Sequence, residues 1–187
     1  MNNKKTKTIK MKAILDLECT CDSPNFLRNE MEIIEIGAIS IDDNFNITDS
    51  FDVFVKPVIH TTLTDFCKEL TTIQQSDVDN GLALFNALEL LQQFFIKNNV
   101  TEWYSWGYFD NNKILSEMTE KKIDHRHFSA LLSIPHRNAS DIFMKQRGFK
   151  QKKGVSKALK ILNLSFIGQK HRAIDDVINI NQILKAM

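Results

Sequence analysis

The sequence predicts one α/β domain in which helices flank a mixed sheet of five strands, and three observations lead to this prediction. Residues 11–55 contain three apolar stretches separated by turn residues, a pattern typical of an antiparallel meander. Residues 62–185 contain helical periodicities that alternate with two further short strands. The chain has 187 residues, of which 43% are hydrophobic and 25% charged, and these values suit a single globular domain with a sizeable core.

The three N-terminal stretches are expected to pair in order. The first strand is expected over 11–18, where it ends in acidic residues, and a polar loop covers 19–30. The second strand follows from the β-branched run at 31–41. The turn residues Asp42-Asp43-Asn44 then reverse the chain into a third, alternating strand at 47–55.

The rest of the chain is expected to alternate between helices and strands. Apolar residues recur at helical spacing in 82–96, and threonines are placed to cap a helix over 62–70. The aromatic stretch 103–106 predicts the fourth strand, and 136–142 predicts a fifth strand that runs into a helix ending at Gly148. The remaining helices are expected over 73–78, 111–122, 155–162 and about 172–185.

Composition indicates a soluble protein of a reducing compartment. We expect residues 1–10 to form a disordered basic tail and residues 11–187 to form the single domain. Three cysteines without a CxxC pair argue against a disulfide framework or a zinc site. No apolar run predicts a membrane span or a signal peptide, so we expect a cytoplasmic protein with no membrane partner. The net charge of +1 indicates no particular partner.

The first strand carries the first chemical signal. Asp16 and Glu18 are two residues apart, so on a strand their side chains point to the same face. Neighbouring carboxylates repel each other and are costly to bury, and Mg²⁺ or Mn²⁺ removes that cost because these ions take oxygen ligands. The alternative is that the strand surfaces at Asp16 and leaves both acids in water.

Two further acidic positions follow along the chain. Asp110 comes after the aromatic strand and before a helix, where it is either a helix cap or a ligand. Asp175 and Asp176 open the final helix, with His171 just upstream. The alternative is that these acids only stabilise the start of the helix, because its N-terminus carries the positive end of the helix dipole.

Taken together, these positions indicate phosphoryl hydrolysis. Four carboxylates and one histidine from separate elements are what a two-metal site requires, with ions about 4 Å apart around the scissile phosphate. The histidine can accept the proton of the attacking water, because its pKa lies near working pH.

The order of these signals resembles a known family. Asp-x-Glu, then Asp, then His-x-Ala-x-x-Asp is similar to the DEDDh branch of the 3′-to-5′ exonucleases, over roughly residues 12–185. Each motif alone is common, whereas the segments in this order are specific. The likeness is greatest to the branch with the histone-mRNA 3′-end exonuclease, the small-RNA-degrading RNAi regulators and the KapD-like bacterial proteins. The stretches that carry it are 16–21, 32–38, 63–67, 70–75, 78–79, 105–107 with Asp110, and 171–180.

The resemblance implies a ribonuclease H-like fold and a role for each acid. His171 would be the general base. In this family the last ligand lies five residues after the histidine, which selects Asp176 over Asp175. The ligands that the resemblance implies for two Mg²⁺ or Mn²⁺ ions are Asp16, Glu18, Asp110 and Asp176.

Substrate contacts follow from the same resemblance. Phe66 and Phe109 match the family's aromatic clamp on the terminal base, and Leu17 could present its backbone to the terminal nucleotide. Ordinary core packing is the alternative for both phenylalanines. The lysines of 150–160 could hold upstream phosphates, or they could form a solvated face.

We therefore expect a metal-dependent 3′-to-5′ exonuclease that releases nucleoside 5′-monophosphates from single-stranded ends, with RNA favoured over DNA by the branch resemblance. A DNA-directed exonuclease is one alternative. A catalytically weak nucleic-acid-binding protein that kept the fold is another. The sequence leaves the oligomeric state and the natural substrate open.

Overall fold

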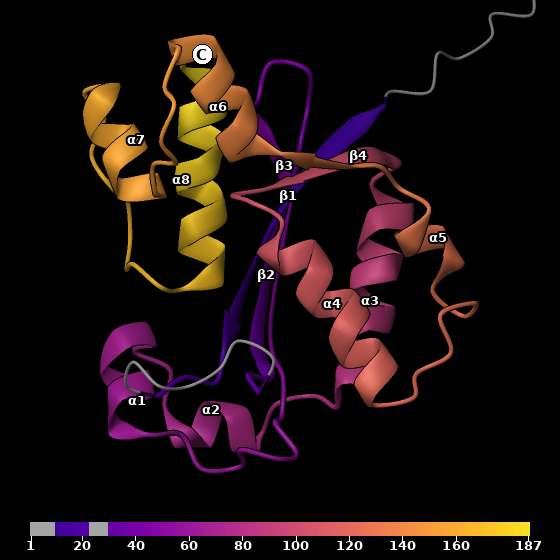
Figure 1. The fold of residues 1–187 in the computed structure, drawn as a ribbon. Coiled ribbons are helices and arrows are strands. Elements are labelled where there is room, and N and C mark those ends of the chain that lie inside the picture. Colours follow the sequence, from indigo (N-terminus) through magenta and orange to yellow (C-terminus); the bar gives the residue numbers. More distant parts are fainter. Residues whose placement is uncertain (1–9, 23–29) are drawn as a thin grey trace, which may run out of the picture.

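The structure, a computed structural model, describes residues 10–22 and 30–187. The predicted basic tail lies almost entirely outside these residues, as does much of the predicted 19–30 loop. A five-stranded sheet lies in the middle with helices on both faces (Figure 1). Its strands are β1 (Met11–Cys19), β2 (Ile33–Ile41), β3 (Ile47–Phe54), β4 (Val100–Ser105) and β5 (His136–Asn138). The helices are α1 (Asp65–Thr71), α2 (Gln75–Asp79), α3 (Leu84–Lys97), α4 (Phe109–Glu120), α5 (Ser129–Leu132), α6 (Ala139–Arg147), α7 (Val155–Ile161) and α8 (Ala173–Lys185).

The strand order is β3-β2-β1-β4-β5. The pairs β1–β2 and β2–β3 are antiparallel, whereas β1–β4 and β4–β5 are parallel. This arrangement confirms the predicted mixed sheet and its N-terminal meander. Within the described residues, none of the helices combines the length and the apolar character needed to cross a membrane.

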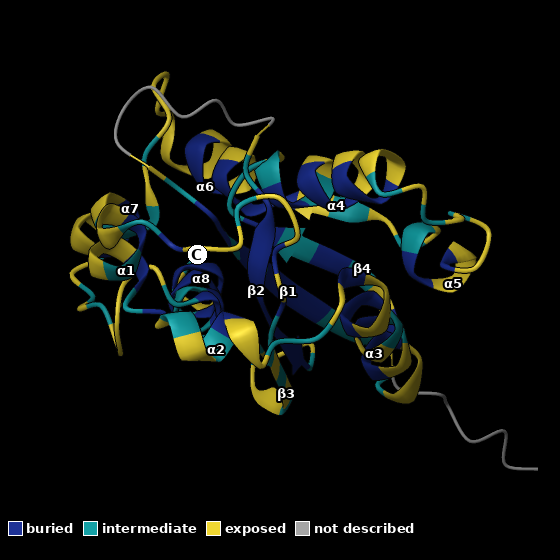
Figure 2. Cartoon of the chain, turned by 90° about the horizontal axis from the view of Figure 1, so that it is seen from below, coloured by how far each residue is buried: buried dark blue, intermediate teal, exposed yellow. Residues whose placement is uncertain are grey.

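The two faces of the sheet carry separate cores. Odd-numbered residues of β1 such as Leu15 pack against α3, α4 and α5, and even-numbered residues such as Ile14 pack against α8. In Figure 2 the strands and the inward faces of the helices are buried, whereas the outward faces of the helices are exposed. Asp16 and Glu18 continue the face of Ile14 toward the end of β1, as the alternation of a strand requires.

Two strand predictions were wrong in extent. β4 begins at Val100 rather than at 103, since Val100 is buried and pairs with Met11 of β1, and the register shifts before Glu102, so the strand does not alternate regularly. The fifth strand ends at Asn138 rather than running to Ile142. The Asn138 side chain accepts a hydrogen bond from the backbone N–H of Asp141 (3.2 Å) and so caps α6.

Helix boundaries agree better with the sequence. Thr64 caps α1, because its hydroxyl accepts from the backbone N–H of Cys67 (3.0 Å), so the helix begins at Asp65 rather than at 62. Gly148 is the C-cap of α6, as predicted. α4 begins at Phe109, two residues earlier than expected. The four residues of α5 were not predicted, because so short a helix leaves no periodic pattern.

The start of α8 lies very close to β2, and Gly37 makes that approach possible. A Cβ at Gly37 would overlap the backbone of Ala173 and Ile174. Gly37 is also the cross-strand partner of Asp16. The close approach therefore sets the first turn of α8 beside the acidic end of β1.

We expect Gly37→Ala to destabilise the protein, because the added methyl group meets backbone that cannot rotate away. Overpacking of this kind costs about 1–3 kcal/mol. In a domain of this size that corresponds to a fall in Tm of roughly 3–10 °C, measured by thermal unfolding followed by circular dichroism.

Gly154→Ala is the matched control. Gly154 has φ −73°, and no heavy atom lies within 4 Å of the position its Cβ would take. This variant should keep the wild-type Tm. Equal Tm values for both alanine variants and the wild type would contradict the close packing of α8 on β2.

Candidate active site

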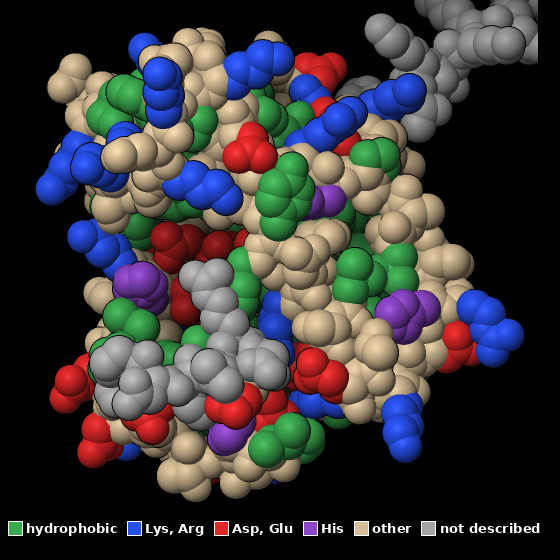
Figure 3. All heavy atoms as spheres, viewed as in Figure 1, with side chains coloured by type: hydrophobic (Ala, Val, Ile, Leu, Met, Phe, Trp, Pro, Cys, Tyr) green, Lys and Arg blue, Asp and Glu red, His purple; other side chains and the backbone are tan. Residues whose placement is uncertain are grey.

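Three carboxylates meet where β1 ends and α8 begins. Asp16 and Glu18 come from β1, and Asp176 comes from the first turn of α8. Their nearest oxygens all lie within 4.8 Å of one another. Figure 3 shows acidic side chains at the floor of a hollow in this face, with lysine and arginine side chains above and to the left of it. The donor set is the all-oxygen type that Mg²⁺ and Mn²⁺ prefer.

Asp110 approaches the same cluster from α4. It is only 5% exposed, and its charge acts on Asp16. The N-cap of α4 is Tyr108, so the interpretation of Asp110 as a capping residue was wrong. Burial raises the pKa of Asp110 to about 6, although the Ser105 hydroxyl and the backbone N–H of Leu17 hold it lower than burial alone would. Asp110 is therefore held by hydrogen bonds from β1 and β4 rather than by solvent.

The cluster concentrates negative charge in a buried place. Burial raises the pKa of Asp16 well above its usual range, and the carboxylates of Asp110 and Glu18 raise it further. Burial together with Asp176 raises the pKa of Glu18 to about 9. Burial raises the pKa of Asp176 to about 6. No described lysine or arginine forms an ion pair with any of these four acids.

Glu35 fixes the start of α8, and sequence reasoning missed it. The Glu35 side chain is fully buried and lies opposite Glu18 across β1 and β2. The Arg172 guanidinium donates twice to its Oε1 (3.0 and 2.9 Å), and the Ala173 backbone N–H donates to its Oε2 (2.9 Å). A glutamate inside the apolar run 31–41 was the available signal, because a charge in a buried strand needs a partner.

The two adjacent aspartates of α8 have different surroundings. The Asp175 carboxylate accepts a hydrogen bond from the backbone N–H of Gln169 (2.7 Å) and lies against Gly168, where a Cβ would overlap it. Asp176 instead belongs to the carboxylate cluster. The structure thus places Asp176, and not Asp175, in the position that the resemblance implied for a ligand.

His171 lies at the rim of the cluster. Its backbone N–H donates to Oδ2 of Asp176 (2.9 Å), and its φ of 59° is in the left-handed region that few non-glycine residues adopt. The ring lines a cavity of about 350 Å³ together with Asp176, Lys157 and Lys170. Burial and the neighbouring Lys170 lower the pKa of His171, which favours the neutral imidazole that a general base requires.

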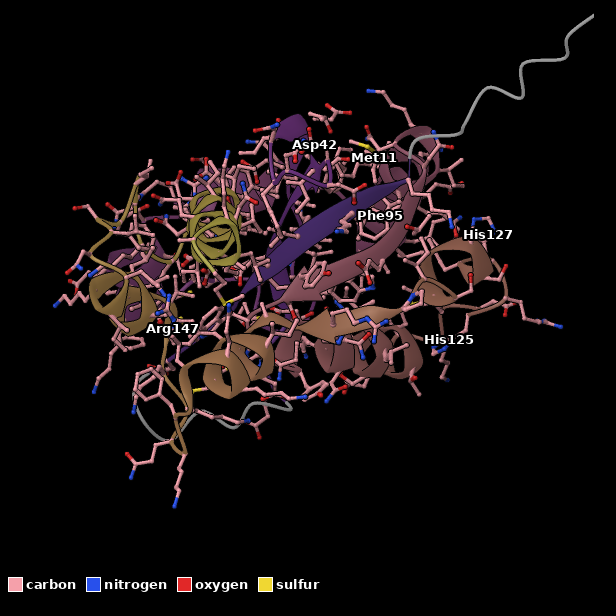
Figure 4. All side chains as sticks on the ribbon, turned by 90° about the horizontal axis from the view of Figure 1, so that it is seen from above. Met11, Asp42, Phe95, His125, His127 and Arg147 are labelled. Atoms are coloured by element: carbon pink, nitrogen blue, oxygen red, sulfur yellow. The ribbon has the colours of Figure 1, made fainter. Side chains whose placement is uncertain are left out.

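Three other histidines have partners elsewhere. His127 packs against Phe85 and Phe128, and His125 lies near it at one end of the molecule (Figure 4). Nε2 of His136 lies 2.9 Å from the hydroxyl of Ser105. His136 therefore reaches the cluster only indirectly, because Ser105 in turn contacts Asp110.

The predicted substrate residues differ in exposure. Phe66 on α1 is 44% exposed, whereas Phe109 is partly buried against the core at the start of α4. The Leu17 side chain is buried in that core, so only its backbone can face the cluster. Their helices adjoin the acidic end of β1, because Sγ of Cys67 on α1 lies 3.7 Å from the backbone oxygen of Cys19 and α4 carries Asp110.

A buried ionic network supports this end of the sheet and was not predicted. Glu117 is fully buried and forms ion pairs with Lys113 (3.4 Å) and Lys121 (2.8 Å). Lys121 also pairs with Glu32 (2.9 Å), whose carboxylate accepts backbone N–H groups from residues 58–60. The network joins α4 to β2. Its members are spread along the chain, so no local pattern indicates their pairing.

The sequence is similar to those of known exonucleases. A family model described as Exonuclease (RNase_T) matches residues 13–184. Human ERI1 exoribonuclease 3 is 29% identical over 191 residues, which cover 93% of this chain and 52% of that protein. The 3′-5′ exonuclease eri1 of Schizosaccharomyces pombe is 27% identical over 212 residues, which cover 100% of this chain and 70% of that protein. The chain thus spans about half the length of the human relative.

A solved structure supports the same grouping. The nuclease domain of 3′hExo, described as a DEDDh family member bound to rAMP, superposes with a TM-score of 0.81 at 24% identity. The match covers 97% of this chain and 92% of that domain. The fold is therefore the ribonuclease H-like fold that the motif order implied. Because the family model matches nearly the whole domain, the chain belongs to the RNase_T exonuclease family.

Proposed function

We propose that this chain is a metal-dependent 3′-to-5′ exonuclease that releases nucleoside 5′-monophosphates from single-stranded nucleic acid, with RNA preferred over DNA. The observation that carries the proposal is the convergence of carboxylates from β1, α4 and α8 without a lysine or arginine partner among the described residues. The human relative is named an exoribonuclease, which supports RNA as the polymer.

Two divalent cations, Mg²⁺ or Mn²⁺, fit this donor set. The ligands would be Asp16, Glu18, Asp110 and Asp176. Their pKa values are raised because no positive charge lies beside them, and a bound cation would supply that charge. When bound, the cations would activate water and neutralise charge on the scissile phosphate.

The protein's own side chains would do the rest. His171 would accept the proton of the attacking water at its ring, because burial and the neighbouring Lys170 lower its pKa and so favour the neutral imidazole. The terminal base would lie between Phe66 and Phe109, while the backbone of Leu17 would contact the terminal nucleotide. Stacking of this kind tolerates every base, which suits removal of one nucleotide after another.

The three free cysteines are compatible with a reducing, cytoplasmic location.

The first test is a gel time course on RNA and DNA oligonucleotides of one sequence, each labelled at the 5′ or the 3′ end. With Mn²⁺ or Mg²⁺ we expect the 5′-labelled RNA to shorten as a ladder and the 3′ label to leave at once as a 5′-monophosphate. EDTA should stop both. If DNA is degraded faster than RNA, DNA is the substrate class. If both polymers bind but neither is cleaved, the protein is the non-catalytic alternative.

The adjacent aspartates provide a matched pair of variants. Asp176→Asn should lower the rate of hydrolysis by at least about 100-fold. Mutating a residue that hydrogen-bonds to a metal ligand typically lowers activity 10–100-fold, and loss of a ligand itself should have a larger effect. Asp175→Asn keeps an oxygen for the N–H of Gln169 and should retain near wild-type rates. Equal losses in both variants, measured with the same labelled RNA, would contradict the assignment of Asp176.

The stability of the metal-free protein should depend on pH, because protons and metal ions bind to the same carboxylates. The pKa of Glu18 is about 9 when folded, so the folded metal-free protein holds a proton that the unfolded chain has released above about pH 5. Stability from this group is full at low pH and is lost as the pH rises toward 9. The lowered pKa values of His136 and His171 act oppositely, but only below about pH 7.

The measurement is Tm at pH 7 and pH 9, with EDTA or with excess Mg²⁺. In EDTA we expect the Tm to fall by several degrees, since 1 kcal/mol corresponds to about 2–4 °C here, and Mg²⁺ should remove most of the fall. Glu18→Gln cannot titrate and should flatten the dependence in EDTA. The same slope for this variant and the wild type would show that Glu18 is not responsible.

A further inference from the structure

Two of the three cysteines lie together at the acidic end of the sheet. Cys21 follows β1, three residues after Glu18, and Cys67 lies on α1 next to Phe66. Both belong to a small apolar cluster that β2, α1 and α2 form. Both also line one cavity of about 90 Å³. The two thiols therefore share one confined space beside the carboxylate cluster.

Direct contacts join these two cysteines. The Cys67 sulfur accepts hydrogen bonds from the thiol and from the backbone N–H of Cys21. The Thr64 hydroxyl bridges the two backbones, because it donates to the oxygen of Cys21 (2.7 Å) and accepts from the N–H of Cys67 (3.0 Å). Thiols in contact, on backbones held together in this way, need only a short movement to form a disulfide, whose S–S bond is about 2.05 Å long.

The two thiols differ in acidity. The hydrogen bond from the Cys21 thiol lowers the pKa of Cys67 to about 7, although burial acts in the opposite direction. The same hydrogen bond raises the pKa of Cys21. Thiolates react with oxidants and thiols do not, so Cys67 is the nucleophile of the pair and Cys21 is the partner that follows.

Cys19 differs from this pair. Its side chain packs in the core with Leu15 and Leu17, and burial raises its pKa well above the usual range. Its backbone oxygen accepts from Sγ of Cys67 (3.7 Å), but its own sulfur does not line the cavity that the pair shares. Cys19 is therefore an internal control for the reactivity of the other two.

The size of the cavity limits which oxidants can reach the pair. Cys67 is fully buried and Cys21 is half-buried, so an oxidant must enter the cavity that both residues line. Hydrogen peroxide is close in size to water, which occupies about 30 Å³ in the liquid. A small hydroperoxide therefore fits the cavity, whereas bulky reagents do not.

A bond between these residues would act on two parts of the proposed site. Phe66, one residue before Cys67, belongs to the proposed base clamp, and the chain from Glu18, a proposed ligand, leads directly to Cys21. A disulfide has no S–H, so the contact from Cys67 to the backbone oxygen of Cys19 would be lost and α1 would be drawn toward residue 21. Misplacing catalytic groups by about 1 Å can cost 100-fold in rate.

We propose that Cys21 and Cys67 form an oxidation site, at which a hydroperoxide reversibly converts the two thiols into a disulfide that lowers nuclease activity. The effect on activity rests on the proposed exonuclease function, whereas formation of the disulfide does not. Disulfides of reducing compartments are typically transient and redox-sensing, which is the role proposed for this one.

The chemistry balances with the hydroperoxide as the only co-reactant. The Cys67 thiolate attacks a peroxide oxygen, so an S–O bond forms, the O–O bond breaks, and the leaving oxygen takes up a proton. Cys21 then attacks the sulfur of Cys67. The S–S bond forms, the S–O bond breaks, and water leaves with the proton of the Cys21 thiol. Two thiols and one hydrogen peroxide thus give one disulfide and two waters.

The first measurement detects the bond itself. The reduced protein in Mg²⁺ buffer is treated with hydrogen peroxide, quenched with catalase, unfolded in N-ethylmaleimide and examined by mass spectrometry. We expect one maleimide per chain, on Cys19, instead of the three of the reduced protein, and a peptide map that joins Cys21 to Cys67. Three maleimides, separately oxidised thiols or a bond between two chains would overturn the inference.

The second measurement compares rates on labelled RNA before and after oxidation. The oxidised wild type should be slower by about tenfold or more, given the cost of misplaced catalytic groups, and dithiothreitol should restore the rate. Recovery identifies the disulfide, because dithiothreitol does not reverse sulfinic acid or methionine sulfoxide.

Three variants locate the effect. Cys21→Ser keeps a hydroxyl that can donate to Cys67, and Cys67→Ser keeps a donor for the backbone oxygen of Cys19, but neither can form the bond. Each should therefore keep its own rate through the peroxide treatment. Cys19→Ala should lose activity on oxidation as the wild type does. Thermal unfolding checks that each variant is folded, and the same loss in both serine variants would overturn the inference.

The two measurements separate failure of the oxidation site from failure of the exonuclease. A reduced wild type that degrades RNA but forms no disulfide would refute the oxidation site and leave the exonuclease standing. A protein that forms the disulfide but degrades no RNA in either state would refute the exonuclease and leave the thiol pair standing. A disulfide that forms without changing the rate would overturn the proposed control of activity.

Discussion

The seating of α8 against β2 is the contact on which the site depends. Gly37 removes the side chain that would keep the helix away, and the Glu35 carboxylate then receives the first backbone N–H of α8 and the Arg172 guanidinium. Both residues lie on β2 directly opposite Asp16 and Glu18. The same contact that docks the helix thus determines the distance between Asp176 and the two acids of β1.

This arrangement works against the stability of the metal-free fold. A core strand that ends in two acids, joined by a third and a fourth from helices, buries like charges together and raises their pKa values. The apolar faces of β1 and the two cores around it must offset that cost. Under the proposed function, cations would offset the rest, because they would supply the charge that no lysine or arginine among the described residues provides.

Sequence patterns predicted most of the fold, because alternation and helical periodicity are local. The acids were also visible, since Asp16 and Glu18 interrupt an apolar strand and Asp110 follows one. The choice between Asp175 and Asp176 was not local, because both lie on the first turn of α8, and it needed the family's spacing. Glu35 escaped prediction, since its role depends on Arg172 and Ala173, which are far away in the sequence. The fifth strand was predicted too long, because Asn138 ends it by capping α6.

The position of Asp176 has a consequence for how the protein is made. Chains emerge from the ribosome with the N-terminus first, so β1 and α4 are available well before α8. Until α8 is synthesised and docks on the sheet, three acids face one another without the fourth. A nascent chain therefore carries no complete carboxylate cluster until α8 has been synthesised and has docked on the sheet.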